Sequence, residues 1–152
     1  MVIADPLPLD VLYEQDETAW LEAMSALAAK GRLSEMDHRN LSEYLSSMAK
    51  RDRREVFSRL VVLLTHLLKW DHQADRRVAS WLGTILEQRR ELRKLIESGT
   101  LYNHAVSVLA EAYAEARKQA AVETALPREA FPVDLDGDLD ALLIEEDDDT
   151  GV

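Results

Sequence analysis

The segment from Val56 to Trp70 constrains the fold more than any other part of the sequence. Its polar side chains gather on one arc of a helical projection: Ser58, Arg59, Thr65, His66 and Lys69. The remaining circumference, roughly 240°, is apolar. An ordinary surface helix has a narrower apolar stripe, so several neighbouring helices must cover this one. The sequence therefore predicts an all-α protein, a single compact helical bundle of about five helices around a central apolar helix at about 52–70.

Length and a change in composition near the C-terminus suggest the domain organisation. A chain of 152 residues fits one domain. We expect a helical bundle domain over 1–132 and an acidic C-terminal tail over 133–152. The tail has few apolar side chains to anchor it, so we expect it to be mobile, with one docked turn as the alternative. The available anchors are Leu139, Leu142, Leu143 and Ile144.

Helical spacing and capping residues place the other elements. We expect an extended arm over 5–11, and helices over about 16–30, 37–50, 76–97 and 101–124. Gly31 is expected to end the first helix, Ser34 with Asp37 three residues on to cap the start of the second, and Ser98-Gly99 to close the fourth. Because no Gly or Pro occurs between Asp37 and Trp70, one long helix is an alternative to two.

Arg89 falls near the middle of the apolar stripe of the fourth helix. That stripe comprises Val78, Leu82, Ile85, Leu92 and Ile96, widened by Trp81, Leu86 and Leu95. A buried, unpaired guanidinium would cost several kcal/mol, so a carboxylate or several carbonyls should reach it. Asp16 is the leading candidate, with Glu43 and Glu123 as alternatives. We favour a structural pair or an outward-reaching side chain for Arg89, and an anion-binding role is the alternative.

Charge and the absence of cysteine narrow the function classes. The net charge is −11, with a basic middle segment between two acidic ends. With no cysteine, disulfides, thiolate metal sites and cysteine nucleophiles are excluded. The N-terminus lacks the pattern of a signal peptide, and no apolar run approaches the roughly 20 residues of a membrane span. We therefore expect a cytoplasmic protein without membrane association.

The sequence contains no recognisable metal or catalytic motif. No two of its four histidines stand four residues apart on one helix face. The tail aspartates partly match a calcium loop that would end at Glu145, but Leu139 occupies the position that requires glycine. Phosphate loops, nucleophile elbows and dinucleotide-binding glycine motifs are absent. We therefore expect no metal, no cofactor and no catalytic activity.

Several short motifs resemble the bacterial domain-of-unknown-function family twenty-nine. They are Leu12-Tyr13-Glu14-Gln15-Asp16 with Trp20-Leu21, His66-Leu67-Leu68-Lys69-Trp70, Arg77 with Ser80-Trp81, Thr84-Ile85 with Gln88-Arg89, Glu123-Thr124 with Leu126, and Phe131-Pro132. The resemblance implies a compact all-helical bundle and no established activity. It adds weight to a candidate polar cluster, structural or binding, that comprises Asp16, His66, Trp70, Arg77, Trp81, Gln88 and Arg89.

These observations favour a non-enzymatic regulatory or protein-interaction module that binds a protein partner or associates with itself. One alternative is a nucleic-acid-associated protein that uses the basic segment 50–94, with the acidic tail as a restraint. Its basic residues are Lys50, Arg51, Arg53, Arg54, Arg76, Arg77, Arg89, Arg90, Arg93 and Lys94. A further alternative is an enzyme that binds a small anion around His66, Arg77 and Arg89, with histidine as acid or base.

Overall fold

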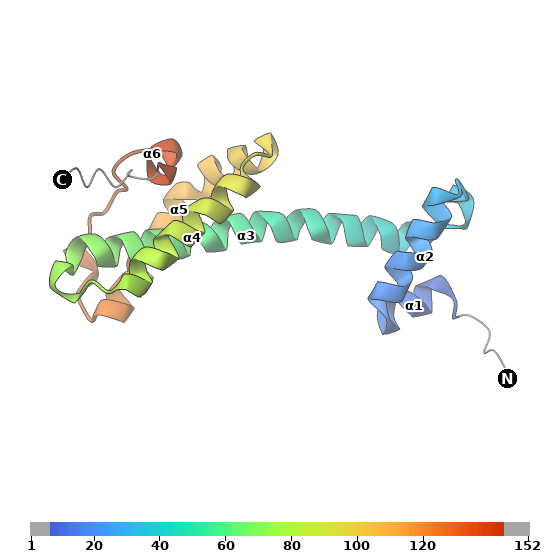
Figure 1. The fold of residues 1–152 in the computed structure, drawn as a ribbon, viewed down its shortest axis with the longest axis horizontal. Helices are drawn as coiled ribbons and strands as arrows, with labels where there is room; N and C mark the ends of the chain where they lie inside the picture. The colour runs from blue at the N-terminus through green and yellow to red at the C-terminus, as the bar shows by residue number, and fades with distance from the viewer. Residues whose placement is uncertain (1–6, 145–152) are drawn as a thin grey trace. The chain divides into compact units, whose positions relative to one another are not determined.

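The computed structural model describes residues 7–144, which form six α-helices and no β-strand (Figure 1). The all-α prediction is confirmed. Contacts within the chain define two units, Met1–Lys50 and Arg51–Val152, and we describe each by itself. The predicted boundary at residue 132 remains a prediction.

The first unit is built around one buried tryptophan. It contains α1 (Leu9–Gln15), α2 (Glu17–Ala29) and the first turns of α3 (His38–His72). Trp20 on α2 is 0% exposed. Its ring packs between Tyr13, at 4.7 Å between centroids, and Tyr44, at 5.7 Å. Aromatic pairs at these separations add to the stability that burial gives, so this cluster forms the core of a unit with few other buried side chains.

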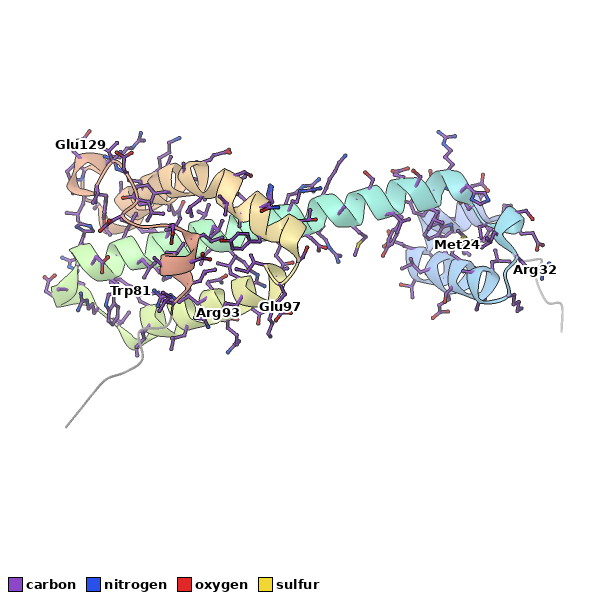
Figure 2. The ribbon with its side chains drawn as sticks, turned by 90° about the horizontal axis from the view of Figure 1, so that it is seen from above. Met24, Arg32, Trp81, Arg93, Glu97 and Glu129 are labelled. Atoms are coloured by element: carbon purple, nitrogen blue, oxygen red, sulfur yellow. The ribbon has the colours of Figure 1, made fainter. Side chains whose placement is uncertain are left out.

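The turns of the first unit agree with the sequence in two places and differ in one. Gly31 adopts a left-handed φ of 68° after α2, as predicted. Asp37 accepts a hydrogen bond from the Asn40 backbone N–H at 3.3 Å, and its own N–H faces the Met24 sulfur at 3.4 Å (Figure 2). The extended arm predicted over 5–11 is wrong from Leu9 onward, because Pro8 fits the position before the first turn and α1 begins there.

The second unit packs the C-terminal part of α3 against α4 (Ala79–Leu95) and α5 (Gly99–Thr124). The predicted central helix is confirmed, since Val56, Leu60, Leu63, Leu64 and Leu68 of α3 all belong to the buried core. Facing residues are Ile85 and Leu92 of α4 and Ala105, Ala112, Tyr113, Ala116 and Ala120 of α5. The small alanine side chains allow close approach of α5 to its neighbours.

Three predicted helix boundaries need correction. The interval from Asp37 to Trp70 is one helix, the alternative left open by its lack of Gly and Pro. The fourth helix begins at Ala79 rather than near Arg76, because residues 74–76 form a 3₁₀ turn. Ser98 does not close that helix but caps α5, accepting a hydrogen bond from the Leu101 N–H at 3.4 Å.

After α5 the chain returns along the bundle as a segment that we call the C-terminal strap, residues 131–144. It contains the short helix α6 (Leu139–Leu143), which contacts α4 and α5 (Figure 1). The strap buries four apolar side chains: Phe131, Leu139, Leu142 and Leu143. The alternative of one docked turn is therefore confirmed for 139–143. The rest of the predicted tail, 145–152, lies outside the described residues.

Candidate functional site

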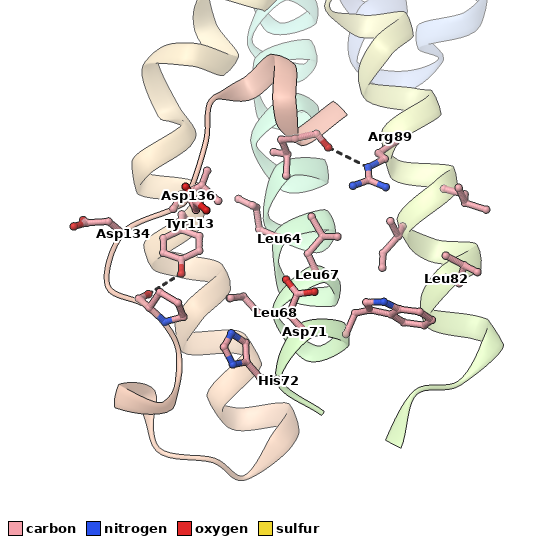
Figure 3. Close-up of a pocket in the computed structure, with 16 residues that line it drawn as sticks. Leu64, Leu67, Leu68, Asp71, His72, Leu82, Arg89, Tyr113, Asp134 and Asp136 are labelled. Carbon is pink, nitrogen blue, oxygen red and sulfur yellow. Dashed lines mark hydrogen bonds between the residues drawn. The ribbon is translucent and has the colours of Figure 1, made fainter. Parts of the chain in front are cut away.

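Arginines of α4 hold the strap by the carbonyls at the end of α6. The Nε of Arg89 donates a hydrogen bond to the Leu142 carbonyl at 3.0 Å, and the Nε of Arg93 donates to the Leu143 carbonyl at 2.9 Å (Figures 2 and 3). The last carbonyls of a helix have no partner within the helix and carry partial negative charge. The two guanidinium groups therefore bring hydrogen-bond donors and positive charge to the carbonyls at the end of α6.

The beginning of the strap is fastened to α5 in the same way. The hydroxyl of Tyr113 donates a hydrogen bond to the Pro132 carbonyl at 2.6 Å, and the Nε of Arg117 donates to the Phe131 carbonyl at 3.0 Å. Burial raises the pKa of the Tyr113 phenol, so it keeps its proton and remains a donor. The strap is thus anchored at both ends by side chains that bind its backbone.

Between these anchors lies a cavity of about 510 Å³ (Figure 3). Its wall is mainly apolar, with side chains from α3, α4 and the strap: Leu64, Leu67, Leu68, Trp70, Leu82, Ile85, Leu86, Leu135 and Leu142. Binding pockets of drug-sized ligands or anchoring side chains have volumes in the range of about 300–1,000 Å³ and are lined mostly by apolar groups. The size and lining of this cavity therefore suit an apolar group.

Three acidic residues are among those that line the cavity. Asp71 of α3 and Asp134 and Asp136 of the strap line it, and all three are exposed. Arg89 also lines it from α4, and its guanidinium already contacts the strap (Figure 3). The polar part of the lining thus holds three carboxylates, Arg89 and His72, and with histidine counted as neutral its formal charge is negative around an apolar interior. This arrangement favours a partner group that is apolar at its tip and positive at its edge.

The apolar stripe of α4 divides in the structure. Ile85 and Leu92 enter the core, but Val78, Leu82 and Leu86 stay 48%, 43% and 44% exposed. Leu82 and Leu86 stand four residues apart on α4, so they lie in one line on the helix surface, and Val78 precedes them as the N-cap residue of the helix. Leu82 and Leu86 also line the cavity. We call Val78, Leu82 and Leu86 the α4 stripe; with the cavity it forms a continuous apolar surface.

The seven predicted cluster residues are brought together only in part. Trp70 and Arg89 line the same cavity. Arg77 stacks on Trp70, with its guanidinium carbon 4.6 Å from the ring centroid, and its Nε donates to the Trp70 carbonyl at 2.8 Å. Trp81 instead receives the ammonium of Lys69 over its ring at 4.6 Å.

The other predicted cluster residues have local partners. The Nδ1–H of His66 donates to the Val62 carbonyl at 2.9 Å, within α3. The Gln88 side chain accepts a hydrogen bond from Arg59 at 3.2 Å. The Asp16 carboxylate caps α2 by accepting from the Ala19 N–H at 3.1 Å. These contacts give no support to the predicted pairing of Asp16 with Arg89.

Sequence reasoning missed the residues that complete the cavity. Asp71 and Tyr113 were not among the predicted site residues. The strap residues Asp134, Leu135 and Asp136 were assigned to a mobile tail. A signal for the strap existed, since Leu139, Leu142 and Leu143 stand at i, i+3 and i+4, the spacing of a single amphipathic turn.

Neither a metal site nor a membrane span emerges from residues 7–144. Over that range, no group of three or more His, Asp or Glu side chains is placed to hold a metal ion. The same residues include no helix long and apolar enough to cross a membrane. The partial calcium-loop match noted in the sequence would end at Glu145, which lies outside this range.

Comparison with known proteins agrees with the motifs in the sequence. No curated protein and no solved structure matches the chain significantly. The family model described as "Domain of unknown function DUF29" matches residues 12–146, which is most of the chain. The protein therefore belongs to the DUF29 family.

Proposed function

We propose that the protein is a non-enzymatic protein-interaction module, and that the α4 stripe and the adjoining cavity bind a helical segment of a partner protein. One observation carries this proposal: Leu82 and Leu86 on α4, with Val78 at its N-cap, are each more than 40% exposed, and the two leucines line an apolar cavity of about 510 Å³. Contiguous exposed apolar surface at a concave site is typical of interaction surfaces.

The strap supports a helical occupant. On a helix, Arg89 and Arg93 continue the line of Val78, Leu82 and Leu86 towards the C-terminus. The helix α6 contacts α4 at Arg89 and Arg93 through the carbonyls of Leu142 and Leu143. One half of this face of α4 thus already binds an amphipathic helical turn. A partner helix on the other half would bind in the helix-in-groove mode, with anchors at intervals of three and four.

Charge favours a different protein over a second copy of the chain. A two-fold symmetric contact through the stripe would bring two identical acidic rims together, each with Asp71, Asp134 and Asp136. Each chain also carries a net charge of −11. Like charges placed opposite one another oppose association. Self-association through this surface is therefore the less favoured outcome.

The two alternatives receive less support from the contacts. Of the predicted nucleic-acid-binding residues, Arg89 and Arg93 bind strap carbonyls, Arg77 stacks on Trp70, and Lys94 pairs with Glu91 at 3.1 Å. A small-anion enzyme would need His66 beside Arg77 and Arg89, but the residues that line the cavity include only Arg89 of these three. These contacts therefore give no reason to prefer nucleic-acid binding or small-anion catalysis over the proposed function.

The experiment is quantitative copurification from the native host with a surface double variant. Leu82→Ser with Leu86→Ser removes the centre of the stripe, and Val122→Ser, at a residue of α5 that is 78% exposed, is the control. Both variants should fold, since exposed substitutions change stability by about 0.5 kcal/mol or less. We expect at least one protein to copurify with wild type and the control and to be lost from the double variant. Identical copurification with all three proteins would refute the proposal.

A further inference from the structure

We infer that the partner segment is basic: it inserts a bulky apolar side chain into the cavity and places lysine or arginine against the acidic rim of Asp71, Asp134 and Asp136. This inference rests on the proposed function, because it names the chemistry of the partner that the α4 stripe binds. Its starting point is the difference between the cavity interior, which is apolar, and its edge, which is acidic.

The cavity size sets the first requirement on the partner. At about 510 Å³ it has room for one or two large apolar side chains. The α4 stripe continues this surface outward through Leu86, Leu82 and Val78, so a helix with apolar residues at i, i+4 and i+7 can follow it. Burial of these apolar side chains favours binding.

The rim sets the second requirement. Asp71 comes from the end of α3, whereas Asp134 and Asp136 come from the strap, so the acidic edge flanks the cavity from two elements. Arg89 is the cation among the lining residues, and its guanidinium contacts the Leu142 carbonyl. A glutamate-rich partner would place like charges against three carboxylates. A lysine-rich partner would place opposite charges against them.

The test measures binding of two synthetic amphipathic helices to the full chain by fluorescence anisotropy. Both peptides have about 18 residues, long enough for helix formation, and share one leucine face. Their polar positions are all lysine in one peptide and all glutamate in the other. We expect the lysine peptide to bind about tenfold more tightly, which corresponds to about 1.4 kcal/mol.

Because the whole chain is acidic, the decisive comparison is between two charge-matched triple variants. The rim variant carries Asp71→Asn, Asp134→Asn and Asp136→Asn. The control carries Glu14→Gln, Glu22→Gln and Glu111→Gln, which are exposed residues outside the cavity lining. We expect the rim variant to lose most of the preference for lysine and the control to keep it.

Two results would overturn the inference. The first is an equal effect of the two triple variants, which would assign the preference to net charge alone. The second is equal binding of the two peptides, or binding of neither. The proposed function would survive each of them if the Leu82 and Leu86 double variant still lost its copurifying protein, so the two failures are distinguishable.

Discussion

The guanidinium of Arg89 on α4 donates to the backbone carbonyl of Leu142 on α6 at 3.0 Å, across 53 residues of sequence. This contact explains why an arginine stands in the middle of an apolar stripe. The strap supplies a carbonyl at the end of a helix, where partial negative charge accumulates. Arg89 thus joins the α4 helix, the strap and the cavity between them.

Replacing Arg89 by Met should loosen α6 while leaving the bundle folded. Methionine keeps the apolar contacts of the side chain but cannot bind the Leu142 carbonyl. Hydrogen bonds from charged groups contribute about 1.5–3 kcal/mol, so amide exchange in 139–143 should accelerate by tenfold or more. Hydrogen–deuterium exchange measures this. The control is Arg90→Met, since the Arg90 side chain is 61% exposed; equal acceleration in both variants would contradict the account.

Replacing Leu139 by Ala should also weaken the attachment of the strap to the bundle, here through lost apolar packing. Leu139 is buried, and truncation of buried leucine costs about 2–5 kcal/mol when the site cannot collapse. Because the strap is a peripheral element, the loss should appear as local opening of 131–144 rather than as an equal fall in global stability. Limited proteolysis near Gly137 should become faster. Ile144→Ala, at a residue that is 62% exposed, should change the rate little.

The stability of the first unit should fall in acid because of Asp37. Burial acts to raise the pKa of this carboxyl, but hydrogen bonds from Asn40 and Trp20 outweigh it and hold the pKa below its ordinary value of 3.8. A group with a lowered pKa in the folded state stabilises the fold above its unfolded pKa and loses that contribution as the pH falls through the folded value. Fluorescence of Trp20, whose Nε1–H donates to Asp37 at 3.2 Å, should report the loss below about pH 4.

Asp37→Asn is the matched control for this pH dependence. It removes the titrating group but keeps an acceptor oxygen for the Trp20 and Asn40 donors. The tryptophan signal of the variant should therefore change less steeply with pH over the same interval. Indistinguishable acid transitions in wild type and variant would show that Asp37 is not the responsible group.

Lys69→Met should leave stability nearly unchanged. The Lys69 side chain is only 11% exposed; its ammonium lies over Trp81 at 4.6 Å and 3.9 Å from the Glu123 carboxylate. The Glu123 side chain is 36% exposed, so its carboxylate stays solvated when the ammonium is removed, and the desolvation cost of the Lys69 charge disappears. Denaturant unfolding should show a change within about 1 kcal/mol. A loss of several kcal/mol would show that the cation is essential to the packing.

Local patterns in the sequence were sufficient to predict most of the fold. The wide apolar arc at 52–70 predicts the central part of α3, and Gly31 occupies its predicted capping position. Of the predicted capping pair, Asp37 caps α3, whereas Ser34 lies in a 3₁₀ turn before it. The beginnings of α1 and α4 were harder to predict. The helix α1 begins directly after Pro8, and α4 begins shortly after the 3₁₀ turn at 74–76. At such positions, the residue that makes the first helical hydrogen bond can differ by one or two from the residue expected.

The candidate site was less predictable, because tertiary contacts decide it. Helical spacing placed Val78, Leu82 and Leu86 on the same stripe as Ile85 and Leu92, but spacing cannot say which part of a wide stripe the neighbours cover. The sequence predicts a carboxylate or several carbonyls as the partner of Arg89, and the structure places the Leu142 carbonyl there; a backbone carbonyl is a group that every residue carries and no sequence pattern marks.

Photo-crosslinking tests most directly whether the α4 stripe is a protein-binding surface. A photoreactive amino acid would replace Leu86, beside the cavity, or Val122 as the exposed control, in the full chain expressed in its native host. We predict a discrete crosslinked adduct to another protein from position 86 and none from position 122. The same adducts from both positions, or a position-86 adduct only to a second copy of the chain, would contradict the proposed binding of a partner protein.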